Sequence, residues 1–285
     1  MTLKTVRGLH AAHRDDIGDL TTRRPVPGPK LQQVDPFLFL NHHGPQVYGP
    51  GNNGLPFGPH PHRGFETVTF IVDGALTHRD SAGFESVIRA GGVQWMTAGS
   101  GLVHAELSPD EFKRAGGPLE ILQLWVNLPS RLKMTAPRYQ GFQDDQIPVV
   151  DLPGGKAWMQ VVAGQWGDVS GPVESLTGNF MSVVEMQVGG RLDAGQLSGR
   201  NVFLYVVSGA GRVNGQAVSE HHLVELDVEG DELAVEADSA ARLLFGHGEP
   251  IGEPVVSYGP FVMNSPDEIR QAIADYQAGR MGALT

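Results

Sequence analysis

Short runs in which apolar and polar residues alternate recur along most of the chain. Within the segment 119–128, leucine or valine occupies every second position from 122 to 128, and residues two apart lie on one face of a strand. The segment 67–72 is rich in β-branched and aromatic residues, which also favours a strand. We predict further short strands, bounded by Gly, Asp, Asn or Ser, at 35–40, 75–80, 86–89, 93–98, 157–163, 179–188, 201–208, 212–214, 223–228, 232–237 and 241–245.

The period of a helix is found near the end of the chain. Residues 265–268, Ser-Pro-Asp-Glu, form a capping box, and apolar residues recur at 269, 272, 273 and 276 before Gly279. We therefore predict a short C-terminal helix. Residues 108–111 form a similar box with proline at the first helical position, but Gly116 limits that helix to two turns.

Glycine and proline set the character of the remaining chain. There are 38 glycines and 20 prolines among 285 residues, without a collagen-like period, which indicates many tight turns and a mainly β protein. The prolines within 21–29 predict an ordered wrap or loop over residues 1–34 rather than a helix or a central strand.

Charge and cysteine content narrow the function classes. A net charge of -11 opposes direct binding to nucleic acid or to an anionic membrane. The chain has no cysteine, so disulfides, thiolate ligands and cysteine nucleophiles are excluded. Residues 1–20 do not resemble a signal peptide, and no apolar run is long enough to span a bilayer. We expect a cytoplasmic protein.

The length favours two domains of similar size. The charged, irregular stretch 131–153 separates two sets of predicted strands, and segment 67–74 resembles segment 202–209. We therefore expect an N-terminal domain at 1–135 and a C-terminal domain at 150–285, built as two copies of one β-barrel unit.

Two pairs of metal-capable side chains stand out in the first half. His60 with His62, and His104 with Glu106, each lie two residues apart and so project from one face of a strand. Three imidazoles and one carboxylate facing one another form a metal site. A single His-x-His is common on exposed loops, but two such pairs separated by strands favour a metal over that interpretation.

The second copy lacks all four ligand types. When the repeats are matched, Gly195, Leu197, Arg242 and Leu244 take the four positions, so we predict one metal per chain, in the first half. The adjacent histidines His42 and His43 would point to opposite sides of an extended segment. We do not expect them to be metal ligands, although one could line a pocket. His221, His222 and His247 are expected to be ordinary polar residues.

The chain resembles a known family. Gly54, His60-x-His62 and Glu66 are similar to the first cupin motif, and Gly92 with Gly101-x-x-His104 is similar to the second. More specifically, several segments resemble the pirins: 35–38, 60–68, 94–99, 104–106, 122–129 and 259–264.

This resemblance implies an all-β fold of two tandem cupin barrels (double-stranded β-helices, or jelly rolls) with a short C-terminal helix. It also implies that the N-terminal barrel holds one metal, usually iron, on His60, His62, His104 and Glu106. In other cupins the first-motif glutamate is the carboxylate ligand, so Glu66 competes with Glu106, and the pirin resemblance favours Glu106. The stretch 246–264 resembles the pirin segment that returns toward the N-terminal barrel, where it would help to close the metal pocket.

Two main functions and a weaker third follow from the resemblance. The first is a dioxygenase that cleaves a flavonol such as quercetin with O2 and releases carbon monoxide, with Glu106 taking the substrate proton. The donor set suits Fe(II), Ni, Mn, Cu or Zn, and the resemblance favours Fe(II). Aromatic residues that could wall a pocket for this small aromatic substrate are Phe37, Phe39, Phe65, Trp95 and Trp125. The alternative is a regulatory protein in which the metal's redox state controls binding of a protein partner, and a weaker one is a cupin isomerase or stress protein.

Overall fold

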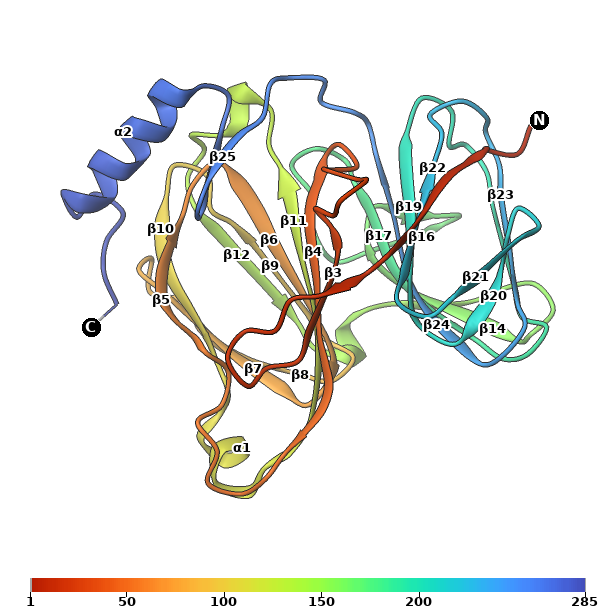
Figure 1. Cartoon of the computed structure of the whole chain (residues 1–285), viewed down its shortest axis with the longest axis horizontal. Coiled ribbons are helices and arrows are strands. Elements are labelled where there is room, and N and C mark those ends of the chain that lie inside the picture. Colours follow the sequence, from red (N-terminus) through yellow and green to blue (C-terminus); the bar gives the residue numbers. More distant parts are fainter. Residues whose placement is uncertain (1, 285) are drawn as a thin grey trace. The chain divides into compact units, whose positions relative to one another are not determined.

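The computed structural model describes residues 2–284, which form two compact units (Figure 1). We call the unit comprising residues 14–22, 39–144 and 251–284 the first barrel. The second barrel comprises residues 2–13, 23–38 and 145–250. The linear domain limits expected from the sequence, 1–135 and 150–285, stay a prediction.

Two antiparallel sheets build the first barrel. In the larger sheet, five strands follow one another in the order β12 (Arg138–Phe142), β9 (Val93–Thr97), β6 (Phe65–Asp73), β11 (Gly117–Asn127) and β4 (Phe37–Tyr48). The smaller sheet has the order β5 (Phe57–His62), β10 (Leu102–Leu107), β7 (Ala75–Asp80) and β8 (Glu85–Arg89).

Apolar residues from both sheets pack between them. Leu76 and Ile88 of the smaller sheet lie in one buried cluster with Ile71, Leu119 and Ile121 of the larger sheet. Leu119 and Ile121 lie on the face of β11 that also carries Gln123. The alternating residues Leu122, Leu124 and Val126 are buried on the opposite face of that strand.

The C-terminal segment of the first barrel adds a hairpin and a helix. Strands β25 (Val256–Tyr258) and β26 (Phe261–Met263) pair, and α2 (Pro266–Gln277) follows them. The Ser265 hydroxyl accepts a hydrogen bond from the Glu268 backbone N–H at 3.3 Å, which confirms the predicted helix and its cap. Ile269 and Ala272 of α2 are buried with Phe261 and Met263.

The predicted cap of the other helix is wrong. Helix α1 (Asp110–Ala115) begins after Pro109, and no side chain caps it. The Ser108 hydroxyl instead accepts a hydrogen bond from the Leu55 backbone N–H at 3.0 Å. Ser108 thus anchors the preceding loop, so its oxygen is used outside the helix.

Two antiparallel sheets also build the second barrel. One has the order β1 (Val6–Ala11), β22 (His222–Leu226), β19 (Asn201–Ser208), β24 (Ala241–Gly248), β17 (Phe180–Met186), β14 (Ala157–Ala163) and β13 (Val149–Asp151). The other has the order β18 (Arg191–Ala194), β23 (Leu233–Ala237), β20 (Ala210–Val213) and β21 (Gln216–Ser219). A single apolar cluster that includes Leu204, Val224 and Phe245 fills this barrel.

The expectation that residues 1–34 form an ordered wrap or loop is wrong for two segments. Strand β1 pairs with β22 at the edge of a sheet, and β3 (Thr22–Val26) is also a strand. The segment of β1 contains no proline, so its backbone donors are available for pairing. The remaining short elements are β2 (His13–Arg14), β15 (Gln165–Trp166), β16 (Val169–Ser170), η1 (Ser130–Leu132) and η2 (Asp144–Gln146). No helix within residues 2–284 combines the length and the apolar character needed to cross a membrane.

Candidate metal centre

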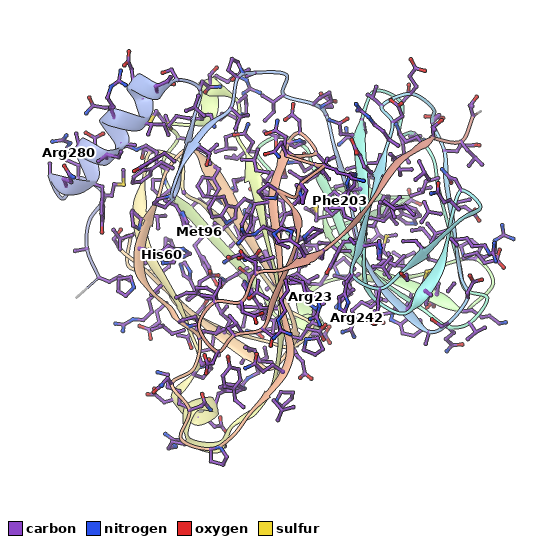
Figure 2. The ribbon with its side chains drawn as sticks, viewed as in Figure 1. Arg23, His60, Met96, Phe203, Arg242 and Arg280 are labelled. Carbon is purple, nitrogen blue, oxygen red and sulfur yellow. The ribbon has the colours of Figure 1, made fainter. Side chains whose placement is uncertain are left out.

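The pairing of β5 with β10 brings three histidines to one face of the smaller sheet. His104 lies directly opposite His60, and Leu102 lies opposite His62 (Figure 2 labels His60). Residues that face each other across antiparallel strands, or lie two apart on one strand, share a face. The three imidazoles therefore converge, and their ligand atoms lie within 4.8 Å of one another.

The contacts of these histidines define which nitrogen each presents. The Nε2 atom of His60 lies 3.1 Å from Nε2 of His62 and 2.9 Å from Nε2 of His104. Behind the ring of His60, Nδ1 donates to the carbonyl of Gly58 at 2.7 Å. The Nδ1 of His62 donates to the carbonyl of Pro260 at 3.2 Å. A neutral imidazole with its proton on Nδ1 has its lone pair on Nε2.

This arrangement fits a divalent transition metal. The Nε2 lone pairs of His60 and His62 face each other, and neither nitrogen carries a proton to donate. A cation between them would remove their repulsion. Ligand nitrogens about 2.1 Å from one ion lie about 3.0–3.4 Å from each other. The observed 2.9 and 3.1 Å are close to this range, so the three imidazoles could hold one ion.

Burial keeps two of the imidazoles neutral. Desolvation is the main cause that lowers the pKa of His62 to about 3, and the charge of His60 adds to it. Desolvation, followed by the charges of His62 and His60, holds the pKa of His104 well below its usual value. Both side chains are therefore unprotonated at neutral pH, as a metal ligand must be.

Glu106 lies on the same strand face as His104, but its carboxylate is not part of the three-histidine group. One oxygen, Oε1, accepts from the Thr69 hydroxyl at 2.8 Å and from the Gln94 amide. The other, Oε2, accepts from the Gln123 amide. These donors form one row across β9, β6 and β11, since Thr69 lies opposite both Gln94 and Gln123. The larger sheet thus holds the carboxylate of Glu106 from across the barrel interior.

Glu66 lies on the other face of β6. On β6, the side chain of Phe65 faces the histidines and that of Thr69 faces Glu106. Glu66 is an odd number of residues from both, so its side chain points to the opposite face of the strand. Its Oε1 accepts from the Thr97 hydroxyl at 2.6 Å, and burial raises the pKa of Glu66 to about 7 despite that hydrogen bond. The structure therefore separates Glu66 from the histidine cluster.

The candidate aromatic wall is only partly at the site. The rings of Phe65 and Trp125 lie 5.0 and 5.5 Å from the ring of His62, and Phe39 stacks on Trp125 at 4.7 Å. Trp95 lies opposite Val68, on the face that carries Glu66. Phe37 packs against Phe203 in the second barrel. Phe39, Phe65 and Trp125 are thus the residues that could contact a substrate.

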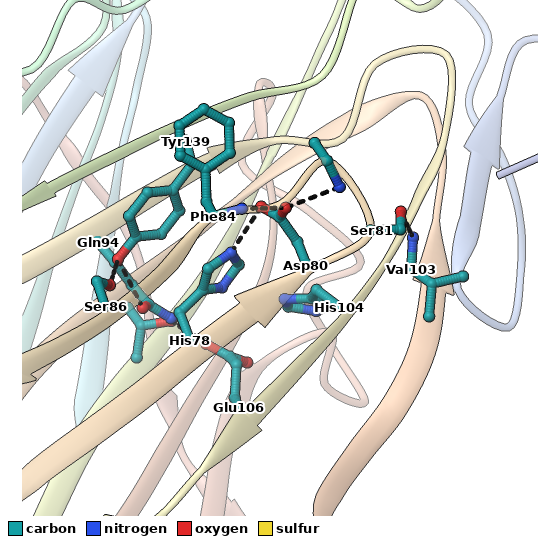
Figure 3. Close-up of polar contacts among 12 residues, drawn as sticks. His78, Asp80, Ser81, Phe84, Ser86, Gln94, Val103, His104, Glu106 and Tyr139 are labelled. Carbon is teal, nitrogen blue, oxygen red and sulfur yellow. Dashed lines mark hydrogen bonds and ion pairs between the residues drawn. The ribbon is translucent and has the colours of Figure 1, made fainter. Parts of the chain in front are cut away.

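The sequence did not single out a buried network beside the site, on β7, β8 and β12 (Figure 3). His78 Nε2 lies 2.9 Å from Asp80 Oδ2, and the His78 ring stacks on Tyr139 at 4.2 Å. The Tyr139 hydroxyl lies 2.5 Å from the Ser86 hydroxyl. The spacing His78-x-Asp80 on a predicted strand was the available signal, because it places both side chains on one face.

The C-terminal segment closes the first barrel beside His62. Arg63 pairs with Asp275 of α2 at 2.6 Å, and the Val262 N–H donates to the Arg63 carbonyl at 3.0 Å. Gly64 has φ +88, and a Cβ on it would lie 2.0 Å from the Val262 carbonyl oxygen. A glycine is therefore required where β26 meets the turn after His62.

The other first-half histidines lie outside the cluster. His42 Nε2 lies 2.8 Å from Glu120 Oε1, and His43 Nδ1 lies 2.8 Å from the Thr22 hydroxyl. In the second barrel, His247 Nδ1 accepts from the Nε–H of Arg200 at 2.7 Å. The absence of metal from the second barrel stays a prediction.

The fold and the site together define a class of protein. Two tandem barrels, each of two antiparallel sheets, form an all-β protein of the cupin type, and the first barrel carries a three-histidine cluster inside. Family models match residues 11–126, as Pirin, and residues 181–282, as the Pirin C-terminal cupin domain. The chain belongs to the pirin family, as the sequence motifs predicted.

Individual relatives cover nearly the whole chain. A Pseudomonas aeruginosa protein named "Putative quercetin 2,3-dioxygenase PA2418" is 42% identical over 251 residues, covering 87% of each chain. A pirin-like protein of Caulobacter vibrioides is 40% identical and covers 98% of each chain. The crystal structure of a quercetin 2,3-dioxygenase from Acinetobacter baumannii is 34% identical, with a TM-score of 0.93, covering 99% of this chain and 100% of the other.

Proposed function

We propose that this pirin is a metal-dependent dioxygenase that cleaves a flavonol such as quercetin with O2 and releases carbon monoxide. The observation that carries the proposal is the convergence of the Nε2 atoms of His60, His62 and His104. We assign Glu106 as the fourth ligand and Fe(II) as the metal, one per chain. The relatives named as quercetin 2,3-dioxygenases support the substrate class.

The bound metal would supply Lewis acidity toward the 3-oxygen of the flavonol and electron exchange with dioxygen. The chain supplies the position and the environment. His60 is the partly exposed member of the cluster, whereas His62 and His104 are buried, so a small molecule would approach from the side of His60. Phe65 and Trp125 beside His62 would then contact the flavonol rings.

Glu106 is suited to accept the proton of the 3-hydroxyl. A carboxylate oxygen has two lone pairs, and the donors Thr69 and Gln94 occupy both lone pairs of Oε1. Oε2 accepts from Gln123 and keeps one lone pair. That lone pair can bind the metal or take the proton, but not both at once. Oε2 would therefore take the proton of the substrate oxygen when its free lone pair is not used for the metal.

The test is carbon monoxide release. Under air, protein loaded with Fe(II), Ni, Mn or Cu should consume quercetin, with loss of its long-wavelength absorbance and transfer of carbon monoxide to deoxymyoglobin. The His60→Ala variant should do neither, whereas His222→Ala, a matched change in the second barrel, should behave as wild type. If carbon monoxide is absent with all four metals, the proposed reaction is wrong.

A further inference from the structure

Two buried nitrogen atoms beside the metal centre need an explanation. Among the described residues, neither Nδ1 of His104 nor Nδ1 of His78 has a hydrogen-bond partner, although both side chains are fully buried. An unpaired buried polar group is destabilising, so such atoms are rare in folded proteins. The two rings are neighbours, with centroids 5.5 Å apart and planes tilted by 50° (Figure 3).

The tautomers of the two rings are complementary. His104 turns Nε2 toward His60, so a neutral His104 that binds metal through Nε2 carries its proton on Nδ1. His78 turns Nε2 to a carboxylate oxygen of Asp80, which accepts and does not donate when ionised. His78 therefore has its proton on Nε2 and a lone pair on Nδ1. One unpaired nitrogen is thus a donor, and the other is an acceptor.

The surroundings of His78 hold its ring in this orientation. One face stacks on Tyr139 with an interplanar angle of 14°, and the Tyr139 hydroxyl is bonded to Ser86. In the pairing of β7 with β10, Asp80 lies opposite His104, and His78 lies opposite Glu106. The pairing of β7 with β10 therefore fixes both histidines on the same face of the sheet.

The other two ligands already have such a partner. His60 donates from Nδ1 to the carbonyl of Gly58, and His62 donates from Nδ1 to the carbonyl of Pro260. Metal-bound histidines almost always donate their second N–H in this way, which orients the ring and raises its basicity as a ligand. His104 is the member of the cluster without a backbone acceptor.

We propose that His78 is a positioning residue whose Nδ1 lone pair accepts the Nδ1–H of His104 in the metal-loaded protein, and that Asp80 sets the tautomer of His78. A chain of interactions from the metal through His104 and His78 to Asp80 then orients His104 as a ligand. This inference rests on the proposed role of His104 as a metal ligand.

The test uses Co(II) as the probe and measures binding rather than turnover. In His78→Phe, which keeps a ring to stack on Tyr139 but has no acceptor, the dissociation constant for Co(II) should rise about 10–100-fold. His78→Gln, whose amide oxygen can accept, should recover part of the loss. His42→Phe removes a buried histidine elsewhere in the first barrel and should leave the dissociation constant nearly unchanged.

Proton NMR of the Co(II) protein separates positioning from general damage. Each ligand imidazole gives one strongly shifted N–H signal, so three are expected, and in wild type that of His104 should exchange slowly with solvent. In His78→Phe that signal alone should move or exchange rapidly. A rapidly exchanging His104 N–H in wild type, or an unchanged dissociation constant in His78→Phe, would overturn the inference. If His104→Ala keeps wild-type Co(II) affinity, the proposed metal centre itself fails, which is a distinguishable result.

Discussion

Replacement of the buried Lys133 by methionine is the sharpest test of how the first barrel is held together. Lys133 is 1% exposed, and its ammonium donates to the carbonyls of Gly64 and Val262, at 2.8 and 3.1 Å, and to Asn127 Oδ1 at 2.7 Å. An ammonium has three N–H donors, so all are used. The lysine thereby joins the turn after the candidate ligands to the C-terminal segment.

The expected loss of stability follows from two opposing contributions. Three hydrogen bonds from a charged donor contribute roughly 4.5–9 kcal/mol, at about 1.5–3 kcal/mol each. Desolvation lowers the pKa of Lys133 from 10.5 to about 8, although Glu253 and Glu268 act in the opposite direction. That shift costs the charged form about 3.4 kcal/mol. Lys133→Met should therefore lower the free energy of unfolding by roughly 1–6 kcal/mol at pH 7.

The pH dependence has a definite sign. The pKa of Lys133 is lower in the folded state than in the unfolded state, so the unfolded state binds more protons between pH 8 and 10.5. Stability contributed by this residue therefore rises with pH in that window, by about 1.4 kcal/mol per pH unit. The difference between wild type and Lys133→Met should widen accordingly, since methionine does not titrate.

Urea unfolding of both proteins at pH 7, 8, 9 and 10 measures this difference. Lys4→Met is the matched control, because Lys4 is equally buried in the second barrel and its ammonium donates to three backbone carbonyls there. It should also lower the free energy of unfolding, with a pH dependence of the same sign, because burial lowers the pKa of Lys4 as well. A Lys133→Met protein as stable as wild type, or a difference that narrows above pH 8, would refute the reasoning.

Two further predictions concern the two buried glutamates. Glu106→Gln should weaken Co(II) binding far more than Glu66→Gln, because Glu66 faces away from the histidines; isothermal titration measures both, and the reverse order would make Glu66 the ligand. Glu66 has its pKa raised from 4.5 to about 7 by burial, so the folded state binds more protons between these values and stability falls as pH rises through that window. Chemical unfolding measures the difference in free energy of unfolding between wild type and Glu66→Gln. This difference should shrink as pH falls from 7 to 4.5, and a difference that stays constant would contradict the assignment.

Much of the fold could be predicted from local pattern. The period-two segment at 119–128 became β11, and the capping box at 265–268 became the start of α2, because both signals act within a few residues. The edge strand β1 was missed, since its pairing with β22 depends on residues more than 200 positions away. The cap at Ser108 was wrong for a similar reason, because Leu55 takes its hydroxyl.

The candidate site could be predicted where two metal-ligating residue types stand two positions apart on a strand. The pairs His60-x-His62 and His104-x-Glu106 lie on two adjacent strands, and the register between them brings the histidines together. The partners of Glu106 were not predictable, because Gln94, Thr69 and Gln123 come from three strands of the opposite sheet. No single-sequence pattern states which strand faces which across a barrel.

Metal stoichiometry tests the central claim most directly. Protein purified without added metal, stripped with chelator and reloaded with Fe(II) under anaerobic conditions, should hold one ion per chain by elemental analysis. The His60→Ala and His104→Ala variants should hold less than a tenth of that amount, and His222→Ala should hold one. Two tightly bound ions in wild type, or full occupancy in either of the first two variants, would contradict the metal centre.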